Sequence, residues 1–183
     1  MIVYSNKRFL VVDDFSDFRS SVKAMLTQMG AQHIDVAASG AEAIALCGKT
    51  RYDIILHDYN LGDGKNGQQV LEELHQRKLI GPHCIFVMVT AESSQAMVMA
   101  ALEYEPDAYL TKPFNNKILK QTAKNLLESR RKLQERFSQE IILTPKDISI
   151  SSYDERFLES LQNVLDASKS DPERPRTPKK RPT

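Results

Sequence analysis

The chain has 183 residues, of which 41% are hydrophobic and 27% charged, and this suits one domain of ordinary size with an appendage. Its two cysteines, Cys47 and Cys84, lie far apart and form no CxxC pair, which argues against a disulfide framework and against a zinc site. No apolar stretch is long enough to span a bilayer, and the first residues lack the apolar region of a signal peptide. We therefore expect a cytoplasmic protein with reduced, buried thiols and no membrane partner.

The last fifteen residues, 169–183, differ in composition from the rest of the chain. They hold four of the eight prolines and six of the 25 Lys and Arg residues, but only two of the 24 Asp and Glu residues. The net charge of +1 is thus an average of this basic tail and a slightly acidic remainder with 19 basic and 22 acidic residues. We expect the tail to be disordered, because it has no large apolar residue to bury.

Strand-like and helix-like patterns alternate through the first two thirds of the chain. Short apolar runs predict strands at 9–12, 33–37, 53–56, 84–90 and 108–111. Apolar residues at helical spacing predict a helix after each strand, the fourth of them at about 94–103. Five such alternations in about 120 residues indicate an α/β fold with a doubly wound, five-stranded parallel sheet and right-handed crossovers.

The helix predicted from Asn115 continues well past the last strand. Its first part is expected to pack on the sheet, and its second part to project as a basic, partly solvated helix or a weak coiled coil. The residues that keep its rough helical period are Ile118, Leu119, Thr122, Leu126, Leu133 and Phe137.

A short amphipathic helix is predicted near the end of the chain, after an extended or looped stretch at 141–150. Ser152 and Glu155 form a capping-box pattern that opens it. Its apolar face would hold Phe157, Leu158, Leu161, Val164 and Leu165. A helix of this length is not stable alone, so it must dock on another surface.

Three carboxylates are expected to converge at one edge of the sheet. Asp13 and Asp14 end the first apolar run, and Asp58 ends the third. The carboxyl ends of parallel strands are where such sheets keep their sites. Carboxylates this close repel one another unless a cation lies between them, and an all-oxygen site suits a hard ion such as Mg²⁺. The sequence therefore predicts a magnesium site.

Each candidate residue also has a plainer interpretation. Asp13 and Asp14 alone would be solvated loop acids or a helix N-cap, and Thr90 alone is as often a cap of the next helix. Tyr109 alone is more often a core aromatic of an edge strand, and Lys112 alone is a surface lysine before a turn. The ordered set of these residues together with Asp58 favours a site.

His57, beside Asp58, could suggest a phosphohistidine. By strand alternation its side chain points to the opposite face from Asp58, which favours a packed histidine. Met97 and Met99 are likewise expected to be core residues, although methionine surfaces suit adaptable partner faces.

Six residues at or beside strand ends together resemble the receiver domain of two-component response regulators, of the CheY type: Asp13, Asp14, Asp58, Thr90, Tyr109 and Lys112. Their offsets match that family, as do Val-Thr-Ala at 89–91 and Lys-Pro-Phe at 112–114. No single motif is specific, but the ordered set is. The resemblance covers residues 5–128 and implies a flavodoxin-like fold.

The resemblance implies that Asp58 is the phosphoacceptor, taking a phosphoryl group from a phosphohistidine on a sensor histidine kinase or phosphotransfer protein. It implies that Mg²⁺ is held by Asp14 directly, by Asp13 through water, by Asp58, and by the backbone carbonyl of Asn60. Lys112 would supply a cation to the phosphoryl oxygens, with a cis bond to Pro113.

The resemblance also implies a conformational change on phosphorylation and a controlled rate of hydrolysis of the phosphorylated form. Thr90 would donate its hydroxyl to the phosphorylated form, and Tyr109 would turn inward as Thr90 moves. The face formed by the fourth helix, the fifth strand and the fifth helix would then change and bind a downstream protein, with a homodimer as a further option. Asn60 and Glu92 occupy the positions that tune hydrolysis, from which we expect a phosphorylated lifetime of minutes at most.

Some stretches depart from the common pattern. Leu61-Gly62 replaces the usual Met-Pro after the acceptor strand. The stretches 57–74 and 101–114 resemble receivers that precede tetratricopeptide repeats, but no such repeats follow. The segment 143–161 resembles the helix that leads into AraC-type DNA-binding domains, so a chain truncated before its output domain is an alternative.

We therefore expect a receiver domain at 5–128, an extended helix, loop and short helix at 129–168, and a disordered tail at 169–183. The expected function is phosphorylation-driven signalling through a protein–protein contact, without enzymatic turnover beyond autophosphorylation and self-dephosphorylation. One rival is a transcription factor lacking its DNA-binding half, although nucleic-acid binding is not expected of this chain alone. The other is a phosphatase with an aspartate nucleophile, whose Asp-x-Asp pattern is missing after the first strand.

Overall fold

The computed structural model describes residues 2–62, 64–91, 104–140, 156–157 and 159–164. The chain divides into two compact units, Met1–Thr144 and Pro145–Thr183, each of which is described by itself. The division that the sequence suggested, at residues 128 and 168, stays a prediction.

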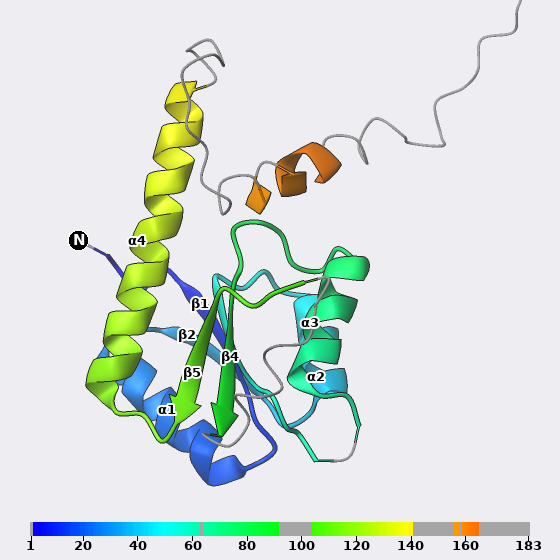
Figure 1. Cartoon of the computed structure of the whole chain (residues 1–183). Helices are drawn as coiled ribbons and strands as arrows, with labels where there is room; N and C mark the ends of the chain where they lie inside the picture. Colours follow the sequence, from blue (N-terminus) through cyan, green and yellow to red (C-terminus); the bar gives the residue numbers. More distant parts are fainter. Residues whose placement is uncertain (1, 63, 92–103, 141–155, 158, 165–183) are drawn as a thin grey trace, which may run out of the picture. The chain divides into compact units, whose positions relative to one another are not determined.

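The first unit is built on a five-stranded parallel sheet (Figure 1). Its strands are β1 (Arg8–Val12), β2 (His33–Ala37), β3 (Ile54–Asp58), β4 (Ile85–Ala91) and β5 (Ala108–Lys112). They lie in the order β2-β1-β3-β4-β5, so the chain reverses its direction of winding after β2. The predicted fold class is confirmed.

Helices cover both faces of this sheet (Figure 1). On one face α1 (Ser16–Gln28) and α4 (Asn116–Glu140) pack with the strands around Phe9, Leu56 and Val87. On the other face α2 (Gly40–Cys47) and α3 (Gly67–Gln76) pack around Ile55 and Phe86. Strand residues therefore alternate between two apolar cores, as expected of a buried parallel sheet.

Helix capping and burial in the first unit follow local sequence patterns. Ser39 caps α2: its hydroxyl accepts a hydrogen bond from the backbone N–H of Glu42 at 3.2 Å, and the Glu42 carboxylate accepts one from the Ala38 N–H at 2.9 Å. Cys47 and Cys84 are buried free thiols. The inward-facing apolar side chains of α2 and α3 are buried, among them Ile44, Cys47, Val70, Leu71 and Leu74. The helix predicted at 94–103 lies outside the described residues.

Helix α4 is longer than the others, at 25 residues, and differs from expectation in detail. Ile118 was expected on its buried stripe but is 46% exposed, and the stripe instead runs through Leu119, Ala123 and Leu127. Successive members of this stripe are four residues apart, which keeps them on one face of the helix. Ala123 was not predicted to be on this stripe, because the prediction relied on large apolar residues.

The second half of α4 is tied to the sheet by Arg130. Its guanidinium pairs with the Asp107 carboxylate and donates to the Pro82 carbonyl. Asp107 also accepts a hydrogen bond from the backbone N–H of Phe86 at 2.7 Å. Because these partners precede β4 and β5, the contact lies at the amino edge of the sheet.

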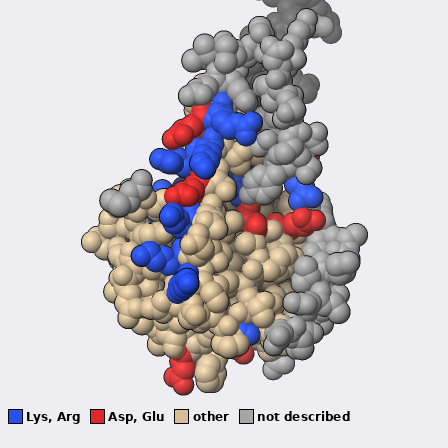
Figure 2. Space-filling view, turned by 60° about the vertical axis from the view of Figure 1, so that its left-hand side comes forward, with Lys and Arg blue, Asp and Glu red and all other residues tan. Residues whose placement is uncertain are grey.

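A row of basic side chains follows the outer side of α4 (Figure 2). The exposed members of this row are Lys117, Lys120, Lys124, Arg131, Lys132 and Arg136. The second half of α4 is thus basic and partly solvated, as predicted, while the alternative of a weak coiled coil stays a prediction.

In the second unit only 156–157 and 159–164 are described, and they are helical. Val164 is exposed, whereas Phe157 and Leu161 are partly buried. Ser152, Glu155, Leu158 and Leu165, the predicted loop at 141–150 and the tail at 169–183 lie outside the described residues. Among the helices that the structure describes, none combines the length and the apolar character needed to cross a membrane.

Gly67, the first residue of α3, sits where no side chain fits. A Cβ there would lie 2.7 Å from the Asp58 carbonyl oxygen and 2.6 Å from the Met88 sulfur. The Gly67 N–H also donates to the Tyr59 carbonyl at 2.8 Å, which holds the chain that leaves β3 against the start of α3.

We predict that Gly67→Ala lowers the free energy of unfolding by about 2 kcal/mol, because backbone has to move to admit the methyl group. Urea unfolding followed by circular dichroism measures the change. Gly48→Ala is the matched control, since its Cβ would meet only ordinary contacts of 3.4 Å or more and its φ of −71° suits any residue. Equal stability of Gly67→Ala and the parent chain would contradict the close approach.

Candidate functional site

Asp13, Asp14 and Asp58 come together at the carboxyl edge of the sheet. One carboxylate oxygen from each lies within 4.8 Å of the others. Asp13 and Asp14 follow β1, and Asp58 is the last residue of β3, the strand that pairs with β1 through Val12 opposite His57. Because neighbouring parallel strands end side by side, the sequence places these acids together.

The three acids differ in their surroundings. Asp13 is fully buried and Asp58 is 7% exposed, whereas Asp14 faces solvent. Asp13 is held from several sides: its Oδ1 accepts the Phe15 N–H at 2.8 Å, and its backbone carbonyl accepts the Arg19 guanidinium at 2.7 Å. Sequence reasoning missed both partners. The Phe15 contact is an Asx turn, which an Asp three residues before the helix could have indicated.

Lys112 brings a positive charge to these carboxylates from the far side of the site. It is the last residue of β5, and its Nζ lies 2.6 Å from Asp13 Oδ2 and 3.4 Å from Asp58 Oδ2. Its peptide bond to Pro113 is cis, as expected. A long side chain is needed here, because β4 separates β5 from β3.

The pKa of Asp58 is raised to about 6, first because the carboxyl is buried and second because the negative Asp13 lies beside it. Lys112 and a backbone hydrogen bond from Asn60 oppose this rise. Asp58 is thus ionised at neutral pH although its burial and the negative charge of Asp13 disfavour the ionised form. A hard cation would remove this cost, and three carboxylates with one exposed member are the ligand type that Mg²⁺ takes. The residues present therefore fit the ion.

The remaining predicted site residues lie around this centre. Thr90 is buried near the end of β4, between the strands that carry Asp58 and Lys112. Tyr109, on β5, is 40% exposed. Asn60 is exposed, and its side-chain oxygen accepts the Gly62 N–H at 3.2 Å. Glu92 lies outside the described residues.

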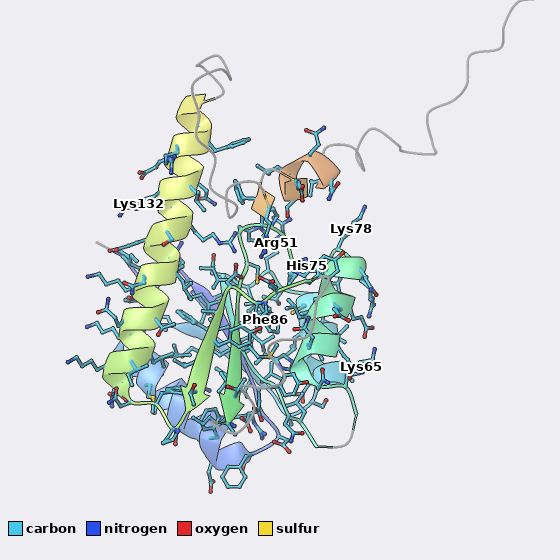
Figure 3. All side chains as sticks on the ribbon, viewed as in Figure 1. Arg51, Lys65, His75, Lys78, Phe86 and Lys132 are labelled. Atoms are coloured by element: carbon cyan, nitrogen blue, oxygen red, sulfur yellow. The ribbon has the colours of Figure 1, made fainter. Side chains whose placement is uncertain are left out.

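His57 is a packed histidine, as strand alternation predicted. It is fully buried, and its ring stacks on Phe86 with centroids 5.5 Å apart. Figure 3 shows Phe86 between β4 and α3, on the face opposite α4. Burial lowers the pKa of His57 to about 4, so the ring is neutral, and its Nδ1 lies 2.8 Å from the Asp58 carbonyl oxygen. The neutral ring therefore donates to the backbone of the neighbouring acid.

One aromatic contact at the site was not predicted. The ring of Phe18, in the first turn of α1, lies under the Lys112 ammonium with 4.1 Å between Nζ and the ring centroid. Phe18 is partly buried and packs against the core on the α1 face of the sheet. No signal in the sequence links it to Lys112, which is 94 positions further along the chain.

Comparison with known proteins gives one consistent result. The family described as "Response regulator receiver domain" matches residues 9–124. The chain is 28% identical over 127 residues to the chemotaxis protein CheY-3 of Vibrio cholerae, which covers 69% of this chain and 96% of CheY-3. It is 29% identical over 139 residues to histidine kinase P4 of Formosa agariphila, covering 62% of this chain but 10% of the kinase.

Comparison with solved structures also points to receiver domains. A CheY-like receiver domain from Methanospirillum hungatei has a TM-score of 0.61 at 30% identity, over 69% of this chain and 97% of that one. The response regulator TrrA of Thermotoga maritima, solved in complex with Mg²⁺ and BeF, has a TM-score of 0.56 at 30% identity, over 66% of this chain and 99% of that one. The fold, the acidic cluster and the family match lead to one conclusion: this chain belongs to the response regulator receiver domain family.

Proposed function

We propose that this receiver domain is a phosphoacceptor that takes a phosphoryl group onto Asp58. One observation carries the proposal: a nearly buried carboxylate with a raised pKa stands 3.4 Å from a lysine ammonium, inside a group of three acids. A buried nucleophile, a cation within reach of it and an acidic cluster are the parts that phosphoryl transfer to a carboxylate needs.

The transfer is a displacement at phosphorus. A carboxylate oxygen of Asp58 forms a bond to the phosphorus atom of a phosphohistidine, and the bond from phosphorus to the imidazole nitrogen breaks. The electron pair of that bond stays on the imidazole, which takes up a proton. Lys112 offsets the negative charge that the phosphoryl oxygens bring to Asp58, and Asp13 holds the ammonium in place at 2.6 Å.

We propose that Mg²⁺ is held by Asp14 directly, by Asp13 through water, by Asp58, and by the backbone carbonyl of Asn60. When bound, the ion would neutralise charge on the phosphoryl group. The cluster of three acids supports this proposal. So does the similarity to TrrA, whose structure was solved with Mg²⁺ and BeF.

The partner that we propose upstream is a histidine kinase or a phosphotransfer protein. The similarity to part of histidine kinase P4 and to chemotaxis proteins supports a place in such signalling. The two free, buried thiols suit the reducing cytoplasm, where we place the exchange. The chain would have no turnover of its own beyond accepting and losing the phosphoryl group.

For the output, we propose that Thr90 and Tyr109 couple phosphorylation to the face that β5 and α4 share. Thr90 lies on the strand between Asp58 and Lys112, where its hydroxyl can respond to a phosphoryl group. Tyr109 is 40% exposed, so its ring is not fixed by a fully packed environment and we propose that it turns inward. A downstream protein, or a second copy of the chain, would bind the altered face.

The first prediction from this proposed function is that incubation with Mg²⁺ and acetyl phosphate adds one phosphoryl group to the chain, and that Asp58→Ala abolishes the gain. Intact-protein mass spectrometry measures it. Asp17→Ala is the matched control, because Asp17 is an exposed acid of the same region outside the cluster. A mass gain that survives Asp58→Ala would show that another residue is the acceptor.

Hydrolysis supplies the second prediction. Water attacks phosphorus, the bond to the Asp58 oxygen breaks, and carboxylate and inorganic phosphate result. Asn60 is exposed beside the acceptor, so it can position that water, and we propose the same role for Glu92 from the family resemblance alone. The phosphorylated form should last minutes, and Asn60→Ala should lengthen its lifetime about tenfold. Decay of the phosphorylated mass over time tests this, and a parent lifetime of many hours in Mg²⁺ would contradict it.

The third prediction concerns stability. Folding raises the pKa of Asp58 from 3.8 to about 6, so the folded state binds the proton more tightly, and stability falls as pH rises through that window. Without divalent ions, Asp58→Asn should therefore be more stable than the parent at pH 7, by about 1–2 kcal/mol after allowance for solvent screening.

Urea unfolding at several pH values measures this difference, which should vanish below about pH 4, where the carboxyl is protonated in both states. Added Mg²⁺ should stabilise the parent more than the variant, because it binds only the folded site and needs the third carboxylate. A variant less stable than the parent at pH 7 without metal would show that Asp58 is not strained by its neighbours.

A further inference from the structure

The Lys112 ammonium is surrounded on three sides. It faces Asp13 at 2.6 Å, Asp58 at 3.4 Å and the ring of Phe18 at 4.1 Å from the centroid. The first two contacts are with acids of the proposed phosphoryl site. The third is with an aromatic side chain that the proposed transfer does not use.

The Phe18 ring is itself fixed. It meets the ring of Phe114 edge to face, with centroids 5.7 Å apart and an interplanar angle of 85°. Phe114 is 9% exposed and belongs to the core between the sheet and helices α1 and α4, and Phe18 packs against that core. Because Phe114 follows Lys112 by two residues, the ring and the amine are tied to the same turn of the chain.

A lysine side chain has four flexible carbons, so confining its ammonium costs conformational entropy. The face of an aromatic ring carries partial negative charge and attracts such a cation, the more so where water is excluded. The Lys112 side chain is only 26% exposed, so the ring takes the place of much of its hydration. Without the ring, the amine would be free to turn away from Asp58 while keeping its contact with Asp13.

We propose that Phe18 is a positioning residue for phosphoryl transfer, holding the Lys112 ammonium beside Asp58 through a cation–π contact that Phe114 keeps in orientation. This inference rests on the proposed function, in which Lys112 serves the phosphoryl oxygens. A purely structural Phe18 would fill the same space, so the test has to separate the charge on the ring face from its volume.

The experiment replaces Phe18 with phenylalanines carrying one, two and three fluorine atoms, which withdraw charge from the ring face at nearly constant shape. The rate of phosphoryl uptake from acetyl phosphate is measured in Mg²⁺ by intact-protein mass spectrometry. We expect the rate to fall stepwise with each fluorine, by about three- to tenfold in total. The same series at Phe9, a buried residue of the same core, is the matched control and should leave the rate unchanged.

A second readout does not depend on phosphorylation. Protons on the Lys112 carbon next to Nζ should resonate upfield in the parent chain, because Nζ itself lies over the ring at 4.1 Å from the centroid, and should return to ordinary positions in Phe18→Leu. Phe18→Tyr, which keeps the ring face, should retain both the shift and the rate.

The outcomes separate the two proposals. A rate that is flat across the fluorinated series, or a Lys112 resonance that Phe18→Leu does not move, would overturn the positioning role while leaving Asp58 as acceptor. Absence of phosphoryl uptake by the parent chain would overturn the proposed function. The Lys112 resonance alone would then decide whether the ring holds the amine.

Discussion

Charge crowding at the end of two neighbouring strands is the constraint on which the rest of the site depends. Asp13 is fully buried and Asp58 nearly so, and their carboxylates would repel each other without compensation. Compensation comes from Lys112, which reaches across from β5 and touches both. Three strands of the sheet are thus linked electrostatically at one edge, and burial and Asp13 still raise the pKa of Asp58 despite the nearby Lys112.

Two adjacent residues of β3 show how strand geometry separates roles. His57 points into the core beneath α2 and α3, where burial keeps it neutral, and its ring holds the Asp58 carbonyl. The Asp58 side chain points to the acidic cluster and keeps an ionisable carboxyl. Adjacent residues of one strand therefore have different roles, since His57 packs into the core on one face and Asp58 presents its carboxyl to the acidic cluster on the other.

Local patterns were enough to predict the sheet and the acidic cluster. Apolar runs of strand length mark β1, β3 and β4, and each run ends at a polar residue, so parallel pairing brings Asp13, Asp58 and Thr90 to one edge. Contacts between distant elements could not be predicted in this way. The ring of Phe18 under Lys112 and the pairing of Arg130 with Asp107 depend on how helices settle on the sheet, which spacing along the chain does not encode. Ile118 illustrates the same limit, because helical period alone did not tell it from Leu119.

The Arg130 contact has a mechanical consequence for α4. The helix meets the sheet at both edges, through Leu119 near the acidic cluster and through Arg130 at the opposite end. A helix that contacts the sheet at two separate positions cannot tilt about one of them unless the contact at the other breaks. Tilting α4 about its first half therefore requires the part-buried Arg130–Asp107 pair to break, and the cost of separating these charges opposes the movement.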